Sequence, residues 1–512
     1  MNRITFRRTI IRYCFAFFLF AVVPCALAED SYQLVLHGGR VIDPETALDA
    51  VLNVAIQDGE IVEVSEHSLI GIETIDVTGK IVSPGFIDLH THSPTPLGQD
   101  YQALDGVTTA LELEIGAYPL ADYGEHIAAK PRLNYGSSVG HFSIRMRVKM
   151  GLEISHAANI ASPKPIGLLG YWTAIRSFFT TPSEGTRERA SDNERASMKT
   201  LLEQGLDAGA LGIGVGLDYV SEGVDEAELD MLFDLAAVRE VPVFIHIRRG
   251  VNGDSSGLKE ALEQARRSGA SVHICHITHN AMRNTSLFLQ MIKDAQDSGV
   301  DVTTEVLPFN AGSATISAAV FQRDWRTIFD IDYSDVEWAA TGERFTESMW
   351  KEYQEEYPQG QVIHHYVKEE WTQQAIADPA VIIVSDLLPM ESLDKKVAPH
   401  NGAFSKILGK YVRDEGLIDL PTAIAKMTLM PAQRLEHFAP AFKKKGRLQV
   451  GADADITIFD PHAIQNRATY QDPYQGSAGI SHVLVNGEFV VKNGELQENS
   501  YPGERLLSAT ED

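Results

Sequence analysis

The stretch Pro84-Gly85-Phe86-Ile87-Asp88-Leu89-His90-Thr91-His92 joins a short apolar run to two histidines at its end. In an extended strand, side chains at positions i and i+2 point to the same side. The imidazoles of His90 and His92 can therefore reach one ion. A solvated histidine pair at the start of a loop would show the same pattern, so the stretch leaves a metal site and a solvated pair as alternatives.

Later apolar runs also end in residues of the types that bind metals. The run at 108–116 carries Glu112 and Glu114 between leucines, and three further runs end at His246, His276 and Asp386. Each run alone has a plain alternative, either a surface strand with one polar face or a hydrogen-bonded core histidine. Five such ends in one chain are hard to attribute to chance, and histidine and carboxylate are the ligands of Zn²⁺ and related divalent ions.

The arrangement of these runs predicts a fold. Apolar runs of strand length alternate with helix-like stretches, and residues 194–208 and 225–240 carry apolar side chains at helical spacing. Alternation over about 350 residues predicts a parallel sheet covered by helices, and a (β/α)8 barrel fits this length. Active sites of such barrels lie at the carboxyl ends of the strands, where the metal-type residues stand.

Both ends of the chain look different from the middle. Short β-type runs separated by turns fill residues 32–84 and 454–491, and Asn486-Gly487 between two apolar runs indicates a hairpin. We therefore predict a barrel over residues 85–440 and a small β-sandwich domain built from residues 29–84 and 441–512. Residues 320–378, rich in Trp, Tyr, Glu and Gln, are expected to form an insertion.

Residues 1–28 have the pattern of a secretory signal peptide. Four arginines precede an apolar run from Tyr13 that ends in Ala26-Leu27-Ala28. A membrane anchor is the weaker alternative, since the run is short and Pro24 interrupts it. We expect cleavage after Ala28 and a periplasmic or secreted protein without a membrane partner after cleavage. Arg7-Arg8 resembles a twin-arginine signal, and the export route stays open.

Composition limits the classes of partner. The 512 residues contain 44 Lys+Arg against 70 Asp+Glu, a net charge of -26. A strongly acidic chain argues against nucleic acid, which requires a basic face, and a small-molecule substrate is expected instead. Of the three cysteines only Cys275 lies outside the signal, so the mature chain cannot form an internal disulfide. Whether it forms a homo-oligomer stays open.

The order His-x-His, carboxylate, His, His, Asp resembles the amidohydrolase superfamily. Within that superfamily, several segments are similar to the N-acyl-D-amino-acid deacylase family, at residues 84–92, 139–141, 205–214, 216–219, 385–386, 426–432 and 451–461. The resemblance implies a (β/α)8 barrel in which a metal-bound hydroxide attacks an amide carbon. The implied cofactor is a divalent metal, with Zn²⁺ preferred, at one or two ions per chain.

The resemblance also implies roles for single residues. His90 and His92 would bind one metal position, and His246 and His276 the other. Asp386 would bind metal, take a proton from water and pass it to the leaving amine, which suits a carboxylate.

Three positions depart from the family pattern. The metal-bridging Cys of the deacylases aligns with Ile115, so we expect Glu114 to bridge, with Glu112 as the second choice. The family's His-Pro-Arg, whose Arg is expected to hold the substrate carboxylate, is absent from residues 397–404. The Tyr expected after the sixth strand aligns near Leu307.

Other residues are candidates to replace the missing groups. Arg145, Arg248 and Arg249 follow presumed strand ends and could bind a carboxylate, although a structural salt bridge is the alternative for each. Candidates for contacting the substrate or supporting the site are His141, His273, His279 and His365. Strand alternation directs Cys275 away from the His276 side, and we expect it to pack in the core.

The expected function is therefore hydrolysis of N-acyl-D-amino acids. N-acyl-D-glutamate is the favoured substrate, because the Glu-x-Glu run resembles that of D-glutamate deacylases. Rival activities are hydrolysis of a cyclic amide or imide and cleavage of a dipeptide, with the same metal chemistry in a different pocket. A decayed barrel that only binds metal is the non-enzymatic alternative.

Overall fold

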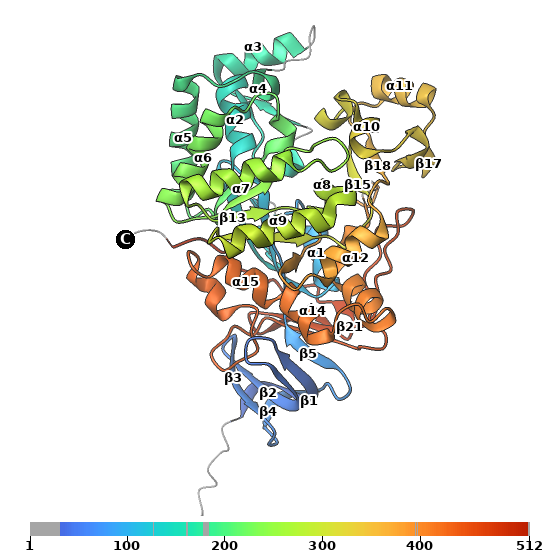
Figure 1. The fold of residues 1–512 in the computed structure, drawn as a ribbon. Helices are drawn as coiled ribbons and strands as arrows, with labels where there is room; N and C mark the ends of the chain where they lie inside the picture. Colours follow the sequence, from blue (N-terminus) through green and yellow to red (C-terminus); the bar gives the residue numbers. More distant parts are fainter. Residues whose placement is uncertain are drawn as a thin grey trace, which may run out of the picture.

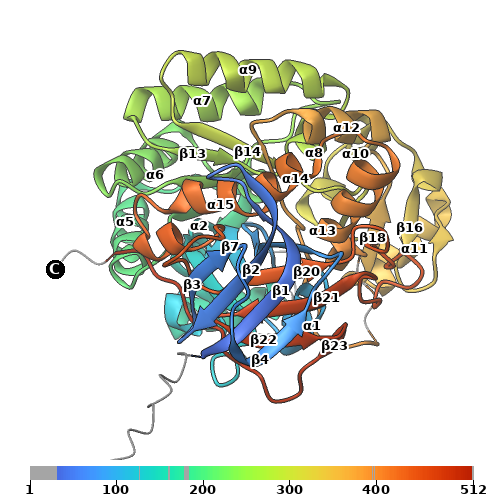
Figure 2. The ribbon, with the colours of Figure 1, turned by 90° about the horizontal axis from the view of Figure 1, so that it is seen from below.

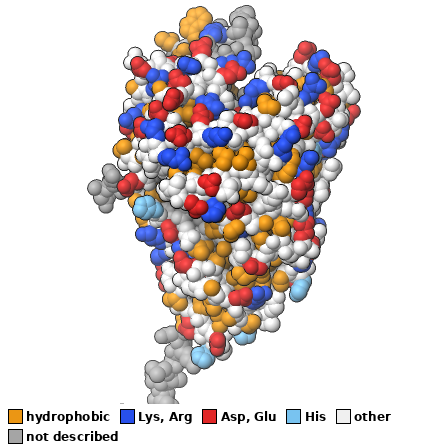
Figure 3. Space-filling view, viewed as in Figure 1, with side chains coloured by type: hydrophobic (Ala, Val, Ile, Leu, Met, Phe, Trp, Pro, Cys, Tyr) orange, Lys and Arg blue, Asp and Glu red, His pale blue; other side chains and the backbone are white. Residues whose placement is uncertain are grey.

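The computed structural model describes residues 31–125, 127–159, 162–177, 184–394, 396 and 398–509. The predicted signal peptide lies outside these residues. In the described part of the chain, no helix has the length and apolar character needed to cross a membrane. Acidic and basic side chains are interspersed over the face seen in Figure 3.

Eight parallel strands form the central sheet, in the order β19-β14-β13-β12-β11-β8-β7-β6. Between the outermost strands, Asp386 N–H donates to His90 O at 2.9 Å and His92 N–H to Leu387 O at 2.7 Å. These bonds join the last strand to the first, and the (β/α)8 barrel predicted from the sequence is confirmed. The strands are β6 (Phe86–Asp88), β7 (Val107–Ala117), β8 (Asn134–Gly140), β11 (Ile213–Gly216), β12 (Val243–His246), β13 (Val272–Ile274), β14 (Val302–Val306) and β19 (Val381–Ile383).

Helices cover the outside of the barrel (Figures 1 and 2). The predicted helix at 194–208 is α5, which begins with a capping box of Ser191 and Glu194 and buries Met198 and Leu202. The one predicted at 225–240 is α6. The main helices are α1 (Pro96–Leu104), α2 (His141–Met150), α3 (Gly167–Ser177), α5 (Asp192–Asp207), α6 (Glu226–Val238), α7 (Ser256–Ser268), α8 (Ile277–Ala281), α9 (Thr285–Asp297), α12 (Glu369–Ala377), α14 (Leu420–Met427) and α15 (Leu429–Leu435).

Strands β8 and β11 are rich in small residues, with glycine in both strands and serine in β8. The small residues have a steric reason. A Cβ on Gly214 would lie 2.7 Å from the carbonyl oxygen of Glu114. Neighbouring backbones therefore approach here more closely than a side chain allows.

The two ends of the chain share one nine-stranded sheet, ordered β23-β22-β21-β20-β5-β1-β2-β3, with β4 paired to β1. This sheet has an apolar core of its own that mixes both ends, including Leu36, Val54, Ile456 and Leu484. The β domain predicted from both ends is thus present (Figure 1, bottom). Its strands are β1 (Tyr32–Asp43), β2 (Leu48–Gln57), β3 (Glu60–Ser65), β4 (Gly71–Asp76), β5 (Ile81–Pro84), β20 (Ile456–Phe459), β21 (Ile480–Val485), β22 (Glu488–Lys492) and β23 (Glu495–Leu496).

An insertion follows β14 and forms a four-stranded sheet ordered β15-β18-β16-β17. It packs around its own aromatic core, which includes Trp325 and Trp350. The sheet begins at Gly312, earlier than the predicted 320, while α12, within the predicted 320–378, contacts β14 and β19 as a helix of the barrel. The insertion elements are β15 (Gly312–Thr315), α10 (Trp325–Phe329), β16 (Val336–Trp338), β17 (Glu343–Arg344), α11 (Glu347–Glu356) and β18 (Gln361–His364).

Candidate metal centre

The first cluster of metal-type side chains lies where β6 meets the chain after β19. Nε2 of His90 and Nε2 of His92 are 3.2 Å apart. Oδ1 of Asp386 lies 3.5 Å from the first nitrogen and 3.4 Å from the second. The two histidine side chains are buried, whereas that of Asp386 keeps 19% of its surface exposed. Asp386 is thus the member of this cluster that is most open to solvent.

The second cluster lies at the ends of β12 and β13. Nδ1 of His246 is 3.1 Å from Nε2 of His276. Oε1 of Glu114 lies 2.9 Å from the first nitrogen and 2.7 Å from the second. All three side chains are buried.

Glu114 joins the two clusters. While its Oε1 faces His246 and His276, its Oε2 lies 3.3 Å from Nε2 of His90 and 3.4 Å from Nε2 of His92. The structure therefore brings the six predicted ligands together, with Glu114 in contact with both clusters.

Glu112, the second choice for the bridge, has a different position. Its Oε2 lies 2.7 Å from Nδ1 of His92, the nitrogen that faces away from the cluster. A carboxylate in this position fixes the tautomer and orientation of a ligating imidazole. The alternating Glu-x-Glu of β7 thus supplies one carboxylate between the clusters and one that orients a histidine.

Glu305 at the end of β14 does for His90 what Glu112 does for His92. Its Oε1 accepts from Nδ1 of His90 at 2.5 Å, and its Oε2 accepts from Nε2 of His273 at 2.9 Å. The sequence interpretation passed over Glu305, although it also lies at a strand end. His273, a candidate for contacting the substrate or supporting the site, thus supports it as a partner of Glu305.

Hydrogen bonds fix the backbone that carries Asp386. Asp88 accepts from Ser385 N–H at 3.1 Å and from the Ser385 hydroxyl at 2.5 Å. Nδ1 of His400 donates to the Asp386 carbonyl at 2.7 Å. Asp386 has a φ of 52° and His276 a φ of 31°, a region that non-glycine residues seldom adopt. Two of the six cluster residues thus have strained backbones, as is common at functional sites.

Burial and neighbouring charges have opposing effects on the pKa values of several groups in the site. Desolvation alone would lower the pKa values of His90 and His92, but the neighbouring carboxylates raise both well above the ordinary value. Burial would likewise raise the pKa of Glu305, whereas His90 and His273 lower it to about 2. Burial, and next the neighbouring His276, lower the pKa of His246 to about 4. The acidic groups thus remain charged in a nearly dry site, as a divalent cation requires, whereas His90 and His92 would have to release their protons when the ion binds.

The donor atoms match the geometry of a tetrahedral ion. Ligands about 2.1 Å from such an ion lie about 3.4 Å apart. The Nε2 atoms of His90 and His92 lie 3.2 to 3.5 Å from each other, from Glu114 Oε2 and from Asp386 Oδ1. The second cluster offers one oxygen and two nitrogens at 2.7 to 3.1 Å, with further positions open. Nitrogen and carboxylate oxygen together suit Zn²⁺ and related divalent ions.

Two of the predicted substrate-binding residues lie elsewhere. Arg145 is completely buried, and its guanidinium donates to Glu228 and to the carbonyl oxygens of Gly185, Glu188 and Gly223. His141 donates from Nε2 to the same Glu228 carboxylate at 2.8 Å. Both side chains lie on the inner face of α2, where this buried network engages them instead of a ligand.

Arg248 also has other partners. Its guanidinium donates to Glu260 at 2.8 Å and to the carbonyl oxygens of Ser221 and Val224. The structure therefore does not bring Arg248 to the cluster. Arg249 is different, because its Nη2 lies 3.4 Å from Nε2 of His246.

Of the remaining histidine candidates, only His279 lies beside the cluster, with its ring centroid 6.2 Å from that of His276. His365 instead contacts Glu337 and Tyr470 in and near the insertion. At the expected tyrosine position, Leu307 is fully buried. A tyrosine reaches the cluster from elsewhere, since the ring centroid of Tyr219 is 5.0 Å from that of His246.

Cys275 packs in the apolar core of the barrel, as expected, but the expectation that it points away from the site was wrong. Its sulfur lies within 4.8 Å of a ligand atom of His90 and of Glu114. Strand alternation fails here because β13 ends at Ile274, and His276 then turns to a positive φ.

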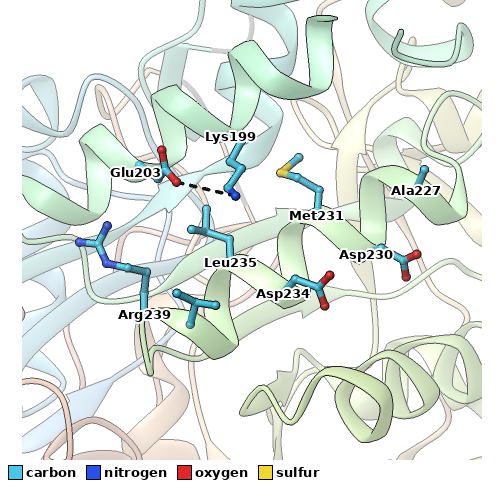
Figure 4. A pocket seen from close by; sticks show the side chains of 9 residues that line it. Lys199, Glu203, Ala227, Asp230, Met231, Asp234, Leu235 and Arg239 are labelled. Atoms are coloured by element: carbon cyan, nitrogen blue, oxygen red, sulfur yellow. Dashed lines mark ion pairs between the residues drawn. The ribbon is translucent and has the colours of Figure 1, made fainter. Parts of the chain in front are cut away.

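A separate surface groove lies between α5 and α6 (Figure 4). It contains an ion pair between Lys199 Nζ and Glu203 Oε1 at 4.0 Å. The other lining residues are Ala227, Asp230, Met231, Asp234, Leu235, Val238 and Arg239, and this set contains no histidine or cysteine. The groove is on the outer helical layer, so the strand-end cluster remains the candidate site.

The chain is similar to proteins of known activity over nearly its whole length. Residues 360–491 match the amidohydrolase family profile. An N-acyl-D-glutamate deacylase and a D-aminoacylase, both from Alcaligenes xylosoxydans xylosoxydans, are 29% and 27% identical to the chain. The two alignments cover 90% and 94% of this chain and 93% and 98% of the relatives.

A solved structure shares the fold. The N-acyl-D-glutamate deacylase from Bordetella bronchiseptica, complexed with zinc and a phosphonate inhibitor that mimics the tetrahedral intermediate, superposes with a TM-score of 0.75. It is 23% identical, and the match covers 93% of this chain and all of that one. The barrel, the family match over residues 360–491 and the relatives thus make this chain similar to the amidohydrolases. Among known amidohydrolases, the chain is similar to an N-acyl-D-glutamate deacylase and to a D-aminoacylase over nearly its whole length.

Proposed function

We propose that this protein hydrolyses the amide bond of N-acyl-D-amino acids, releasing a carboxylate and a free D-amino acid. The observation that carries the proposal is Glu114, whose two oxygens face two separate groups of ligands at the carboxyl ends of the barrel strands. The named relatives support the D-amino-acid substrate, and N-acyl-D-glutamate is the substrate we favour within this class.

We assign the metal positions from the two clusters. His90, His92 and Asp386 form one position, His246 and His276 the other, and Glu114 contributes an oxygen to each. Zn²⁺ at two ions per chain is the occupancy we favour, since the ligands are nitrogen and carboxylate oxygen. When bound, such ions lower the pKa of water and polarise a carbonyl oxygen.

The residues of the chain then supply proton transfer. Asp386 has one oxygen near His90 and His92, and its side chain reaches solvent. The neighbouring histidines lower the pKa of Asp386 against the effect of burial, so the carboxylate is ionised and able to accept a proton at neutral pH. We propose that it takes a proton from the attacking water and delivers it to the leaving nitrogen, the role of a general base and then acid.

The direct test is hydrolysis of a panel of N-acetyl-D-amino acids and their L-enantiomers by zinc-loaded enzyme. Turnover of the D-series, strongest for N-acetyl-D-glutamate, is the expected result. Asp386→Asn serves as the control for contaminating hydrolase. No turnover of any D-substrate would refute the substrate class.

Hydantoins, dihydropyrimidines and D- or β-linked dipeptides belong in the same panel, because the rival activities share the metal chemistry. Turnover of one of these alone would assign the cyclic-amide or dipeptide activity. Metal analysis addresses the non-enzymatic alternative. About two ions per chain together with hydrolysis support an enzyme, and a chain that binds metal without hydrolysing any substrate supports a decayed barrel.

We also propose that the protein is exported, on the strength of the basic and apolar pattern of residues 1–28. Amino-terminal sequencing of the protein recovered from a periplasmic fraction is expected to begin at Glu29. Recovery of uncleaved protein in the cytoplasm would count against export.

A further inference from the structure

Arg249 lies on the loop after β12, directly beside the metal centre. Its Nη2 is 3.4 Å from Nε2 of His246, and its side chain is 8% exposed. Among the described residues, its Nε is buried without a hydrogen-bond partner. A guanidinium has five N–H donors, so Arg249 has donors in the site that this chain leaves unused.

With a metal bound, the contact between Arg249 and His246 would not be a hydrogen bond. Nδ1 of His246 faces Glu114 and His276, so this nitrogen would hold the ion. A neutral imidazole that ligates through one nitrogen carries its proton on the other. Nε2–H of His246 and the guanidinium of Arg249 are then two adjacent donors, and both require an acceptor.

Among the described residues, the guanidinium of Arg249 also has no carboxylate of its own, because it shares Asp218 with a second arginine. Asp218 lies between two arginines, with its Oδ2 3.8 Å from Arg249 Nη1 and 2.8 Å from Arg323 Nη2. One carboxylate therefore faces two guanidinium groups. Nε of Arg323 is likewise buried without a partner in the described structure. This cluster of three side chains thus has a net positive charge in a strongly acidic protein.

Aromatic residues of the insertion hold the guanidinium in position. The centre of the Arg249 guanidinium lies 5.2 Å from the ring centroid of Phe329 and 6.0 Å from that of Tyr366. Tyr366 in turn donates from its hydroxyl to the carbonyl oxygen of His279. Packing against ring faces stabilises an arginine without using its N–H groups. The ring contacts therefore fix the guanidinium in place and leave its N–H donors, among them the Nε that has no partner in the described structure, available to a ligand.

We propose that Arg249, supported by Arg323 and Asp218, binds a carboxylate of the substrate. This inference rests on the proposed function and adds to it the residue that holds a carboxylate of the acyl amino acid, either the α-carboxylate or that of the side chain. It supplies the group that residues 397–404 lack, because Pro399-His400 stands there without an arginine. The insertion thereby contributes to binding, since it provides Arg323, Phe329 and Tyr366.

The test compares substrates that differ only in one carboxylate. N-acetyl-D-glutamate carries both carboxylates. N-acetyl-D-glutamine carries only the α-carboxylate, and N-acetyl-D-isoglutamine carries only the side-chain carboxylate. In Arg249→Gln we expect kcat/KM for N-acetyl-D-glutamate to fall about 10- to 100-fold, the effect of losing a hydrogen bond to a charged group. For the analogue in which an amide replaces the bound carboxylate, the same substitution should change kcat/KM by less than about threefold, because no hydrogen bond to a charged group is lost. The insensitive analogue identifies which carboxylate Arg249 holds.

Arg248→Gln is the matched control, because its guanidinium is engaged by Glu260 and backbone carbonyls. It should leave the preference among the three substrates unchanged. Arg249→Lys keeps the positive charge but loses the paired N–H donors of the guanidinium. It should therefore restore part of the preference for substrates that carry the bound carboxylate. Zinc content and the unfolding temperature of each variant show whether the fold is retained. An equal loss on all three substrates by a folded, zinc-loaded Arg249→Gln would overturn the proposal.

Binding separates this inference from the proposed function. If the wild-type enzyme hydrolyses none of the substrates, calorimetric titration of the zinc-loaded protein with N-acetyl-D-glutamate still measures the subsite. Binding that weakens about 10-fold or more in Arg249→Gln would support the subsite although the activity had failed. Binding that is absent, or unaffected by the substitution, would overturn it.

Discussion

Oε2 of Glu112 lies 2.7 Å from Nδ1 of His92, so the first acidic residue of β7 holds a histidine and is not placed between the clusters. Glu114, two residues further along the same face, has that central position. The period of two in a strand puts both carboxylates inside the barrel. Their separate contacts predict different consequences when each is changed.

Glu114→Gln should prevent stable binding of two ions. The amide removes the negative charge that both clusters share, so we expect zinc content to fall from about two ions per chain to one or none, with activity lost. Glu112→Gln should be milder, because removing a carboxylate that orients a metal ligand costs about 10- to 100-fold in affinity or activity. Zinc per chain after dialysis, measured by mass spectrometry, checks both. Equal effects of the two substitutions would contradict the distinct positions assigned to the carboxylates.

Asp386→Asn should separate catalysis from metal binding. His90, His92 and Glu114 remain as ligands of the first position, so most of the zinc should be retained. Loss of a general acid–base group costs about 10² to 10⁴ in rate. We therefore expect kcat to fall by this amount at nearly unchanged zinc content. Activity within tenfold of the wild type would exclude Asp386 from proton transfer.

The strand-end pattern predicted much of this site. A residue at the carboxyl end of a parallel strand must lie at one rim of the barrel, so His90, His246, His276 and Asp386 could be placed together before their contacts were known. Glu114 was preferred to Glu112 because the bridging Cys of the related deacylases aligns with Ile115, the residue next to Glu114. The structure gives that choice a physical basis, because only Glu114 reaches both clusters.

Other parts of the site depend on contacts between distant segments. Asp218 and Arg323 meet at 2.8 Å across 105 positions, and no periodicity of the sequence encodes that pairing. Arg145 was a reasonable candidate near a strand end, but helix α2 turns its side chain inward to Glu228. Cys275 was misplaced because alternation applies only while the strand continues. Local patterns thus locate the rim of the barrel, and tertiary packing decides which side chains face the ligand.

The buried network of Glu228 should make stability depend on pH. Burial alone would raise the pKa of Glu228, but the hydrogen bond from His141 and the charge of Arg145 lower it to about 2 from the ordinary 4.5. A carboxylate whose pKa is lower in the folded state stabilises that state above the unfolded pKa. This contribution, about 3 kcal/mol, should be present above pH 4.5 and be lost as the pH falls towards 2.

Unfolding temperatures measured between pH 6 and pH 3 in the presence of a chelator would check this, because dissociation of metal then makes no contribution. Glu228→Gln should be less stable at pH 6, since it leaves Arg145 buried without its partner. The gap to the wild type should narrow as the pH falls. Glu203→Gln, a change at an ion pair on the outer helical layer, is the control and should follow the wild type. A gap that stays constant would show that Glu228 is not the group that titrates.

The turn of the β21–β22 hairpin offers a test of how the two chain ends fit together. Gly487 has a φ of 82°, and a Cβ added there would lie 2.9 Å from Cα of Gly59 in the β2–β3 turn. Gly451 has a similar φ of 88°, but a Cβ there would meet no atom within 4 Å. Alanine at either position imposes a left-handed conformation, at a cost of about 1 to 2 kcal/mol. Only Gly487→Ala also pushes against backbone, which typically adds about 1 to 3 kcal/mol. We therefore expect Gly487→Ala to lower the unfolding temperature clearly more than Gly451→Ala. Equal shifts would mean that the two turns separate without cost and that their contact contributes little to joining the chain ends.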